Sequence, residues 1–231
     1  MSTDDELAAA VRAALSAAAN PERAVQQQAY LKSTMPCYGV GNPTVRMIVR
    51  TACAQRPELT RDEWAAAIKS LWTGATHREE CLAAIELADA KRRWAGGDLM
   101  DLYESMAVTG AWWDLVDPLA SHLVAEVLRR EPEQASRIRA WAQGDDPWLR
   151  RVAICCQLRF GSDTDTDLLA EVIEANLFDT KFGTSFFIRK AIGWALREYA
   201  QVDPGWVRGF VDSHSDRLAT LSRREALRHL N

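Results

Sequence analysis

The sequence lacks any apolar run near the roughly 20 residues that a membrane-spanning helix requires. Its first residues, MSTDDEL, are acidic, where a secretory signal would carry basic residues. We therefore expect a cytoplasmic protein with no membrane partner.

Residues that hold metals or form disulfides are few and scattered. The cysteines are odd in number and have no CxxC spacing, and the histidines lack metal-ligand spacing. A glycine-rich phosphate loop after a strand is also missing. We therefore predict no disulfide framework, no metal site and no cofactor, and we expect the cysteines to be buried thiols. The residues concerned are Cys37, Cys53, Cys81, Cys155 and Cys156, with His77, His122, His214 and His229.

The chain also lacks an excess of positive charge, since its formal net charge is −4 at pH 7. This excludes binding of nucleic acid by overall charge alone, so any phosphate-binding surface must be local. A hydrophobic fraction of 48% in 231 residues is typical of a folded protein. We predict one domain over residues 1–231.

The hydrophobic pattern is almost entirely helical. Apolar residues recur three and four positions apart and are separated by Gly, Pro, Asn or Asp, whereas few segments alternate with period two. The fold class predicted is all-α. Representative segments are WAAAIKSLW, HREECLAAIELADAKRRW, LMDLYESMAV, WLRRVAICCQL, DLLAEVIEANL and FFIRKAIGWALREYA.

A repeat is visible in the second half of the chain. The tetrads RVAI, RKAI and REAL begin at Arg151, Arg189 and Arg224, a spacing of about 35 to 38 residues that is typical of HEAT-like helix pairs. One further period toward the N-terminus reaches Trp113. Equivalent positions of a solenoid line one concave face, so these residues form a row there or point into the core between repeats. Arginine ladders with Asp or Glu are the structural alternative for Arg189 and Arg224.

The motif AWWDLVD (111–117) combines indoles with carboxylates. Trp113 and Asp117 are four residues apart, which places them about 40° apart on one helix face. Trp112 points elsewhere and is expected in the core. A purely structural alternative exists for Asp117, because Asp before Pro118 is a common helix N-cap.

Several segments together resemble the AlkD-type DNA alkylation repair glycosylases, which are HEAT-like repeat proteins. The resemblance implies a helical-repeat solenoid with a concave DNA-binding face. It spans nearly the whole chain and rests on YLKSTMPCYGVGNPTVR (30–46), WWDLVD (112–117), WLRR (148–151), FFIRKAIGWALREYA (186–200) and LSRREALRHL (221–230).

The resemblance also implies an activity and a site. Asp117 matches the family's catalytic aspartate, Trp113 and Trp194 match its cleft tryptophans, and Arg151 matches the neighbouring arginine. The implied enzyme is a monofunctional glycosylase that removes cationic N-alkylated purines, such as 3-methyladenine, 7-methylguanine or bulkier N3 and N7 adducts, from duplex DNA. It leaves an abasic site and would associate with the nucleoid when bound to DNA.

These residue types suit that chemistry. An N-alkylated purine leaves as a neutral base, while positive charge develops on the deoxyribose, as in glycoside hydrolysis generally. A fixed carboxylate at Asp117 would stabilise that charge and orient water. Indole faces attract a cationic lesion. Arg151 is expected to hold a backbone phosphate by a bidentate contact.

Other DNA contacts are expected at both ends of the chain. We predict contacts from Arg189, Lys190 and Phe187 on one helix, with core packing as the alternative for Phe186 and Phe187. The residues expected to contact phosphates near the N-terminus are Tyr30, Lys32 and Arg46.

Two other functions stay open at this stage. A non-catalytic HEAT-like DNA-binding protein would keep the surface without excision, although it gains nothing from an anion that faces phosphate. A protein-interaction scaffold would suit the sequence pI of about 5.6, although it has no need of the Trp, Asp, Arg and Trp set. The expected partner is duplex DNA containing alkylated purines, and we expect a monomer.

Overall fold

The computed structural model describes residues 3–230, and within that range it contains helices and no strand, as the sequence predicts. The chain divides into two compact units, one ending at Ala95 and the other beginning at Gly96. The expectation of one repeat domain over the whole chain stays a prediction. None of the described helices is long and apolar enough to cross a membrane.

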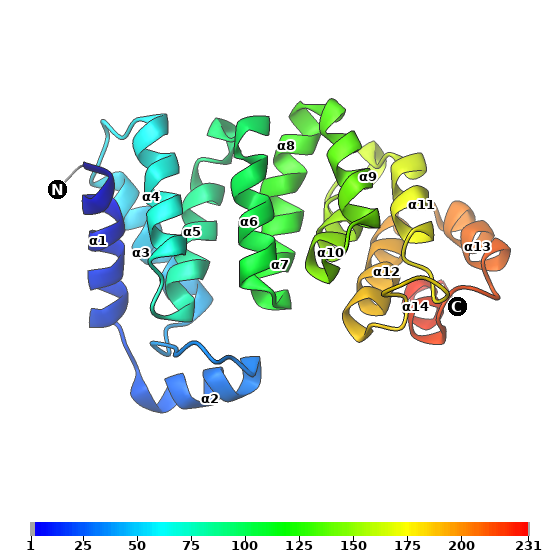
Figure 1. Cartoon of the computed structure of the whole chain (residues 1–231), viewed down its shortest axis with the longest axis horizontal. Coiled ribbons are helices and arrows are strands. Elements are labelled where there is room, and N and C mark those ends of the chain that lie inside the picture. The colour runs from blue at the N-terminus through cyan, green and yellow to red at the C-terminus, as the bar shows by residue number, and fades with distance from the viewer. Residues whose placement is uncertain (1–2, 231) are drawn as a thin grey trace. The chain divides into compact units, whose positions relative to one another are not determined.

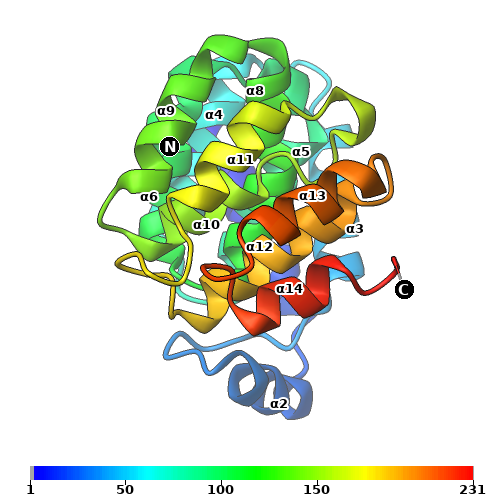
Figure 2. The ribbon, with the colours of Figure 1, turned by 90° about the vertical axis from the view of Figure 1, so that its right-hand side faces the viewer.

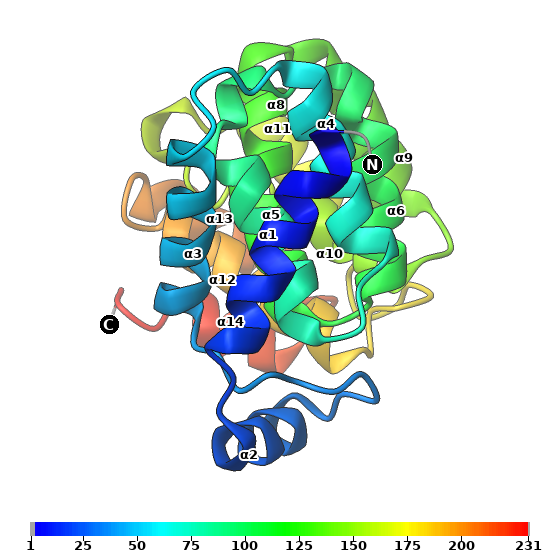
Figure 3. The ribbon, with the colours of Figure 1, turned by 90° about the vertical axis from the view of Figure 1, so that its left-hand side faces the viewer.

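The first unit consists of five α-helices and a terminal 3-10 turn (Figures 1 and 3). Helix α5 packs against α1, α3 and α4, with Trp64, Ile68 and Leu71 fully buried. Helix α2 lies apart from these four, beyond one end of α1. The helices are α1 (Thr3–Ala17), α2 (Pro21–Leu31), α3 (Asn42–Ala54), α4 (Arg61–Thr73) and α5 (Arg78–Ala90), followed by Arg92–Trp94.

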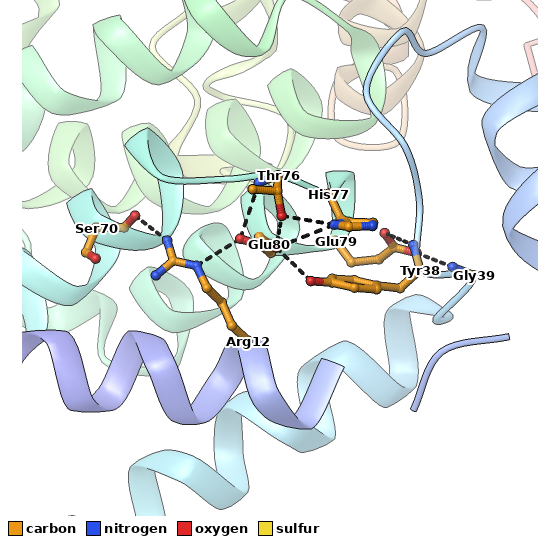
Figure 4. Close-up of polar contacts among 8 residues, drawn as sticks. All are labelled: Arg12, Tyr38, Gly39, Ser70, Thr76, His77, Glu79 and Glu80. Carbon is orange, nitrogen blue, oxygen red and sulfur yellow. Dashed lines mark hydrogen bonds and ion pairs between the residues drawn. The ribbon is translucent and has the colours of Figure 1, made fainter. Parts of the chain in front are cut away.

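Two buried glutamates on α5 fix the loop between α2 and α3 (Figure 4). Glu79 accepts backbone N–H bonds from Tyr38, Gly39 and Val40, at 2.8, 2.8 and 3.0 Å. Glu80 accepts from Arg12 Nε and from the Tyr38 hydroxyl, both at 2.9 Å. Buried carboxylates are tolerated only when fully hydrogen-bonded. These bonds therefore give the loop a single path.

Gly39 is required in that loop for two reasons. Its φ of +81° lies in the left-handed region that glycine adopts without strain. A Cβ at this position would stand 2.2 Å from the Asn20 carbonyl oxygen, at the start of α2. The YGVG stretch of the sequence therefore packs closely against the start of α2.

The second unit stacks helices around α10 and α12 (Figure 2). Helix α10 contacts α6, α7, α9, α11 and α12, and α12 in turn contacts α13 and α14. The helices are α6 (Met100–Gly110), α7 (Trp113–Pro118), α8 (Ala125–Arg130), α9 (Ala135–Gln143), α10 (Pro147–Cys155), α11 (Thr166–Glu174), α12 (Phe186–Tyr199), α13 (Pro204–Ser213) and α14 (Thr220–Ala226). A π-helical segment, Leu119–Val124, joins α7 to α8, and short 3-10 turns occupy Gly97–Leu99, Pro132–Gln134 and Gly161–Asp163.

A glycine lets α14 approach α12 closely. A Cβ on Gly193 would stand 2.6 Å from Glu225 Cβ and 3.1 Å from the Ser222 carbonyl oxygen. The Ser222 hydroxyl also donates to the Arg189 carbonyl at 2.8 Å. The motif IGWALREY therefore carries a small residue where the last helix docks.

We predict that Gly193→Ala lowers the free energy of unfolding by about 1–3 kcal/mol, since the added methyl overpacks the contact between α12 and α14. Gly209→Ala is the matched control, because no atom lies within 4 Å of a Cβ placed there on α13. Helix propensity alone should make that control more stable by up to about 1 kcal/mol. Urea denaturation measures both, and equal stabilisation by the two substitutions would contradict the close contact.

Candidate active site

Asp117 lies within a continuous helical stretch, not at a helix start. Trp112 is the N-cap of α7, and α7 runs through Asp117 and Pro118 directly into the π-helical segment. The reading of Asp117 as an N-cap is therefore wrong. Proline has no N–H to donate and crowds the preceding turn, which favours a locally widened helix. The Ser121 hydroxyl donates to the Asp117 carbonyl at 2.8 Å within this widened turn.

Arg151 on α10 holds the Asp117 carboxylate in a bidentate pair. Its Nε donates to Oδ1 at 2.7 Å and its Nη2 to Oδ2 at 2.8 Å, while Nη1 donates to the Phe187 carbonyl on α12 at 2.5 Å. The side chains of Arg151 and Asp117 are only 6% and 15% exposed. One guanidinium thus joins α7, α10 and α12.

This geometry corrects the expected role of Arg151. Its three nitrogens are engaged by Asp117 and Phe187, and the side chain is buried, so it does not offer a fork to a backbone phosphate. The guanidinium instead orients the carboxylate. Burial raises the pKa of Asp117 above its usual value, and the hydrogen bonds and charge of Arg151 act against that rise.

An open groove of about 430 Å³ leads to this carboxylate. Asp117 and Trp194, two of the four residues expected from the sequence, are part of its wall. Trp113 is half-buried, and the groove wall does not include it. The complete lining is Asp117, Pro118, Ser121, His122, Leu158, Arg159, Trp194 and Glu198.

The groove lining also contains polar residues that were not predicted from the sequence, Glu198, Arg159 and His122. Glu198 accepts the Trp194 indole N–H at 3.1 Å and a bond from Gln201 Nε2 at 2.9 Å, which fixes the indole plane. Arg159 lies 2.7 Å from His122 Nε2 through its Nη1. Since an arginine can only donate, His122 Nε2 is the acceptor. The spacing of Trp194 and Glu198, one helical turn apart, was the available signal for this pair.

An aromatic cluster adjoins the Arg151 pair. Trp112 packs against Trp148 and Phe187 with ring centroids 5.9 and 5.0 Å apart, and Phe187 lies 5.5 Å from Phe186. Phe186 is 55% exposed, so the core-packing alternative is wrong for that residue. Phe187 is half-buried, and the Trp112 indole N–H is buried with no hydrogen-bond partner. The cluster fixes the turn that precedes Trp113.

The other basic residues of the repeats lie in different surroundings. Arg224 is exposed, whereas Arg151 is buried, so the equivalent positions do not form one uniform row. Arg189 is half-buried and its Nε has no hydrogen-bond partner, unlike a ladder arginine. Lys190 Nζ lies 3.4 Å from Glu225, which also accepts from Arg197 Nη1 at 2.6 Å. Burial would raise the pKa of Glu225, but these two cations lower it below its usual value.

The N-terminal residues expected to contact DNA belong to the first unit. Tyr30 and Lys32 lie at the C-terminal end of α2, and both are exposed. Arg46 on α3 is exposed too, and it donates to both oxygens of Glu86 at 2.9 Å. The carboxylate raises the pKa of Arg46 and holds its guanidinium in place.

Four of the five cysteines are buried, as the sequence predicts, whereas Cys53 is only partly buried. Burial raises the pKa of Cys155, which is next to the Asp117 and Arg151 pair, to about 12. This thiol is therefore not a nucleophile at neutral pH. In residues 3–230, no three His, Cys, Asp or Glu side chains gather as ligands for a metal ion.

Comparison with known proteins shows the fold and the family of this chain. A solved structure of a predicted DNA alkylation repair enzyme from Enterococcus faecalis superimposes with a TM-score of 0.81 at 26% sequence identity, over 92% of this chain and 96% of that one. No curated protein matches the sequence significantly. The family of DNA alkylation repair enzymes matches residues 11–230. The chain therefore belongs to the DNA alkylation repair enzyme family.

Proposed function

We propose that this protein is a monofunctional DNA glycosylase that hydrolyses the N-glycosidic bond of cationic N-alkylated purines in duplex DNA. The observation that supports it best is a desolvated carboxylate, Asp117, held in a bidentate pair at the wall of an open groove. In a protein that only bound DNA, an anion placed where the duplex must approach would lower the affinity for DNA.

The reaction needs one stabilised charge and no general acid. The bond between the base nitrogen and C1′ breaks, and its electron pair neutralises the cationic purine, which departs. Positive charge then develops on the sugar, and water adds to C1′ as it loses a proton. Asp117 would stabilise that charge through space and accept a hydrogen bond from the attacking water. Fixed charges act strongly in such a partly desolvated site.

The neighbouring side chains would orient the Asp117 carboxylate and contact the alkylated base. Arg151 is a positioning residue, since it fixes both oxygens of Asp117 before substrate binds. Trp194 would present its indole to the cationic lesion, with its plane set by Glu198. Trp113, one turn before Asp117, would shape the same side of the site.

The DNA backbone would be held by basic and aromatic residues outside the groove. On α12 we propose Arg189, Lys190 and Phe187, and in the first unit Tyr30, Lys32 and Arg46. We propose further that a HEAT-like concave face supports the duplex, and that the protein acts as a cytoplasmic monomer without a metal or cofactor.

We predict that the wild type releases 7-methylguanine and 3-methyladenine from methylated duplex DNA under single-turnover conditions. Asp117→Asn keeps the shape of the side chain and removes its charge, so release should slow by a factor of about 10² to 10³. The DNA strand should stay intact until heat or alkali is applied, since the product is an abasic site.

Asp179→Asn is the matched control, because Asp179 is exposed in the same unit, lies outside the groove lining and pairs with the surface Arg217. It should excise at the wild-type rate. Release by the wild type no faster than without protein would refute the proposal for methylated purines. DNA binding without excision would then become the leading function.

The rate of excision should also depend on pH through Asp117. Burial raises the pKa of this carboxyl above the usual 3.8, and the reaction requires the ionised form. Excision should therefore decline as the pH falls through the Asp117 pKa, beginning at a higher pH than for an ordinary aspartate. Rates measured relative to protein-free DNA test this, and Asp117→Asn should remove the decline. An unchanged pH profile in that variant would assign the titration to another group.

A further inference from the structure

A carboxylate holds the indole of Trp194, the tryptophan that lines the Asp117 groove. The Trp194 indole N–H donates to Glu198 Oε1 at 3.1 Å, one helical turn further along α12. In contrast, the N–H of the fully buried Trp64 in the first unit donates to the Leu87 carbonyl at 2.9 Å. A neutral carbonyl is therefore enough to satisfy an indole N–H, and the negative charge beside Trp194 is not required for hydrogen bonding alone.

The Glu198 carboxylate is fixed at both oxygens and lies at the groove. Its Oε2 accepts from Gln201 Nε2 at 2.9 Å, while its Oε1 accepts the indole N–H. Arg197 Nε lies 3.9 Å from Oε1, beyond hydrogen-bond distance, because Arg197 Nη1 donates to Glu225 at 2.6 Å. The Glu198 side chain is 33% exposed and lines the groove together with Trp194. Its charge is therefore accessible to a ligand in the groove.

The other charged side chains of the groove have partners of their own. Asp117 is matched in charge by Arg151 in the bidentate pair. Arg159 donates through Nη1 to His122 Nε2 on the π-helical segment. Glu198 is the carboxylate that is bonded directly to the groove indole.

An ionised acceptor changes the electrostatics of an indole ring. Hydrogen bonds in a network polarise one another, so an N–H that donates to a carboxylate leaves more negative charge over the faces of the ring. Those faces attract cations, and the attraction grows where water is excluded. The Trp194 indole should therefore favour a cationic base over a neutral base of the same shape.

We propose that Glu198 makes this site selective for the positive charge of the alkylated base. It is a positioning and specificity-determining residue that acts through Trp194, whereas Asp117 acts on the charge that develops on the sugar. The inference rests on the proposed function, because it takes the cationic purine as the ligand. It assigns a second carboxylate to the site, with a task separate from that of Asp117.

The test compares the binding of two duplexes that differ in charge at one base. One contains 7-methylguanine and the other 7-methyl-7-deazaguanine, a neutral base of the same shape, and both carry a 2′-fluoroarabino sugar to prevent hydrolysis. The wild type should bind the cationic duplex about three- to tenfold more tightly, as expected for one cation–π contact. Glu198→Gln keeps an oxygen that can accept the indole N–H and removes the charge. It should lose most of the preference and bind the neutral duplex equally well.

Glu104→Gln is the matched control, because Glu104 Oε2 accepts the Trp141 indole N–H at 3.0 Å in the same unit, outside the groove lining. This variant should keep the wild-type preference. Glu198→Asp retains the charge but withdraws it from the indole by one methylene, so it should keep part of the preference. Circular dichroism melting checks that each variant is folded.

Three results would overturn the proposal. The first is an equal preference for the cationic duplex in the wild type and in Glu198→Gln. The second is a wild type without any preference. The third is an equal loss in Glu198→Gln and Glu104→Gln, which would assign the effect to the fold and not to the groove.

The outcomes separate this inference from the glycosylase. Wild-type protein with a preference that depends on Glu198 but with no release of base would refute excision and support the role of Glu198. Protein that excises 7-methylguanine at the expected rate, with a preference that Glu198→Gln leaves unchanged, would refute the role of Glu198 alone.

Discussion

The arrangement of the second unit depends on one guanidinium. Arg151 on α10 bonds both carboxylate oxygens of Asp117 on α7 and the Phe187 carbonyl on α12, so three helices share a single buried cation. Leaving any of these groups unpaired in a partly buried place would cost several kcal/mol, about 3–5 for a broken buried ion pair. The pair therefore defines where the carboxylate lies before any ligand binds.

A carboxylate that is oriented before the ligand binds suits a reaction in which positive charge develops transiently on the sugar. Arg151 keeps Asp117 oriented, while the groove leaves the carboxylate within reach of a ligand. The groove lining also includes Trp194, with its plane set by Glu198, and the Arg159 and His122 pair. The first unit also contains buried, hydrogen-bonded carboxylates, those of Glu79 and Glu80. There they hold the loop between α2 and α3 in place and have no proposed catalytic role.

Much of this follows from local sequence pattern, because apolar spacing reports helices directly. The all-α class follows from that spacing. The expectation that Asp117 and Trp194 lie in one cleft came instead from the resemblance to the AlkD-type glycosylases, and both line the groove. The π-helical segment after Pro118 could not be predicted. An Asp-Pro pair occurs both at the start of a helix and inside one, and the sequence does not distinguish the two cases. The Asp117 to Arg151 pair could not be predicted either, since it forms between residues 34 apart, whereas pattern reasoning compares neighbours. The buried Glu79 and the exposed Phe186 run against the usual preferences of their residue types.

Stabilisation of a cation on the sugar by Asp117 is measured more directly by the affinity for a cationic analogue than by the rate of excision. Duplex DNA with a cationic pyrrolidine in place of one deoxyribose imitates that charge, and DNA with a neutral tetrahydrofuran imitates only the shape. The wild type should prefer the cationic duplex, and Asp117→Asn should lose most of that preference while binding the neutral duplex equally well. An equal preference in both proteins would contradict electrostatic stabilisation by Asp117.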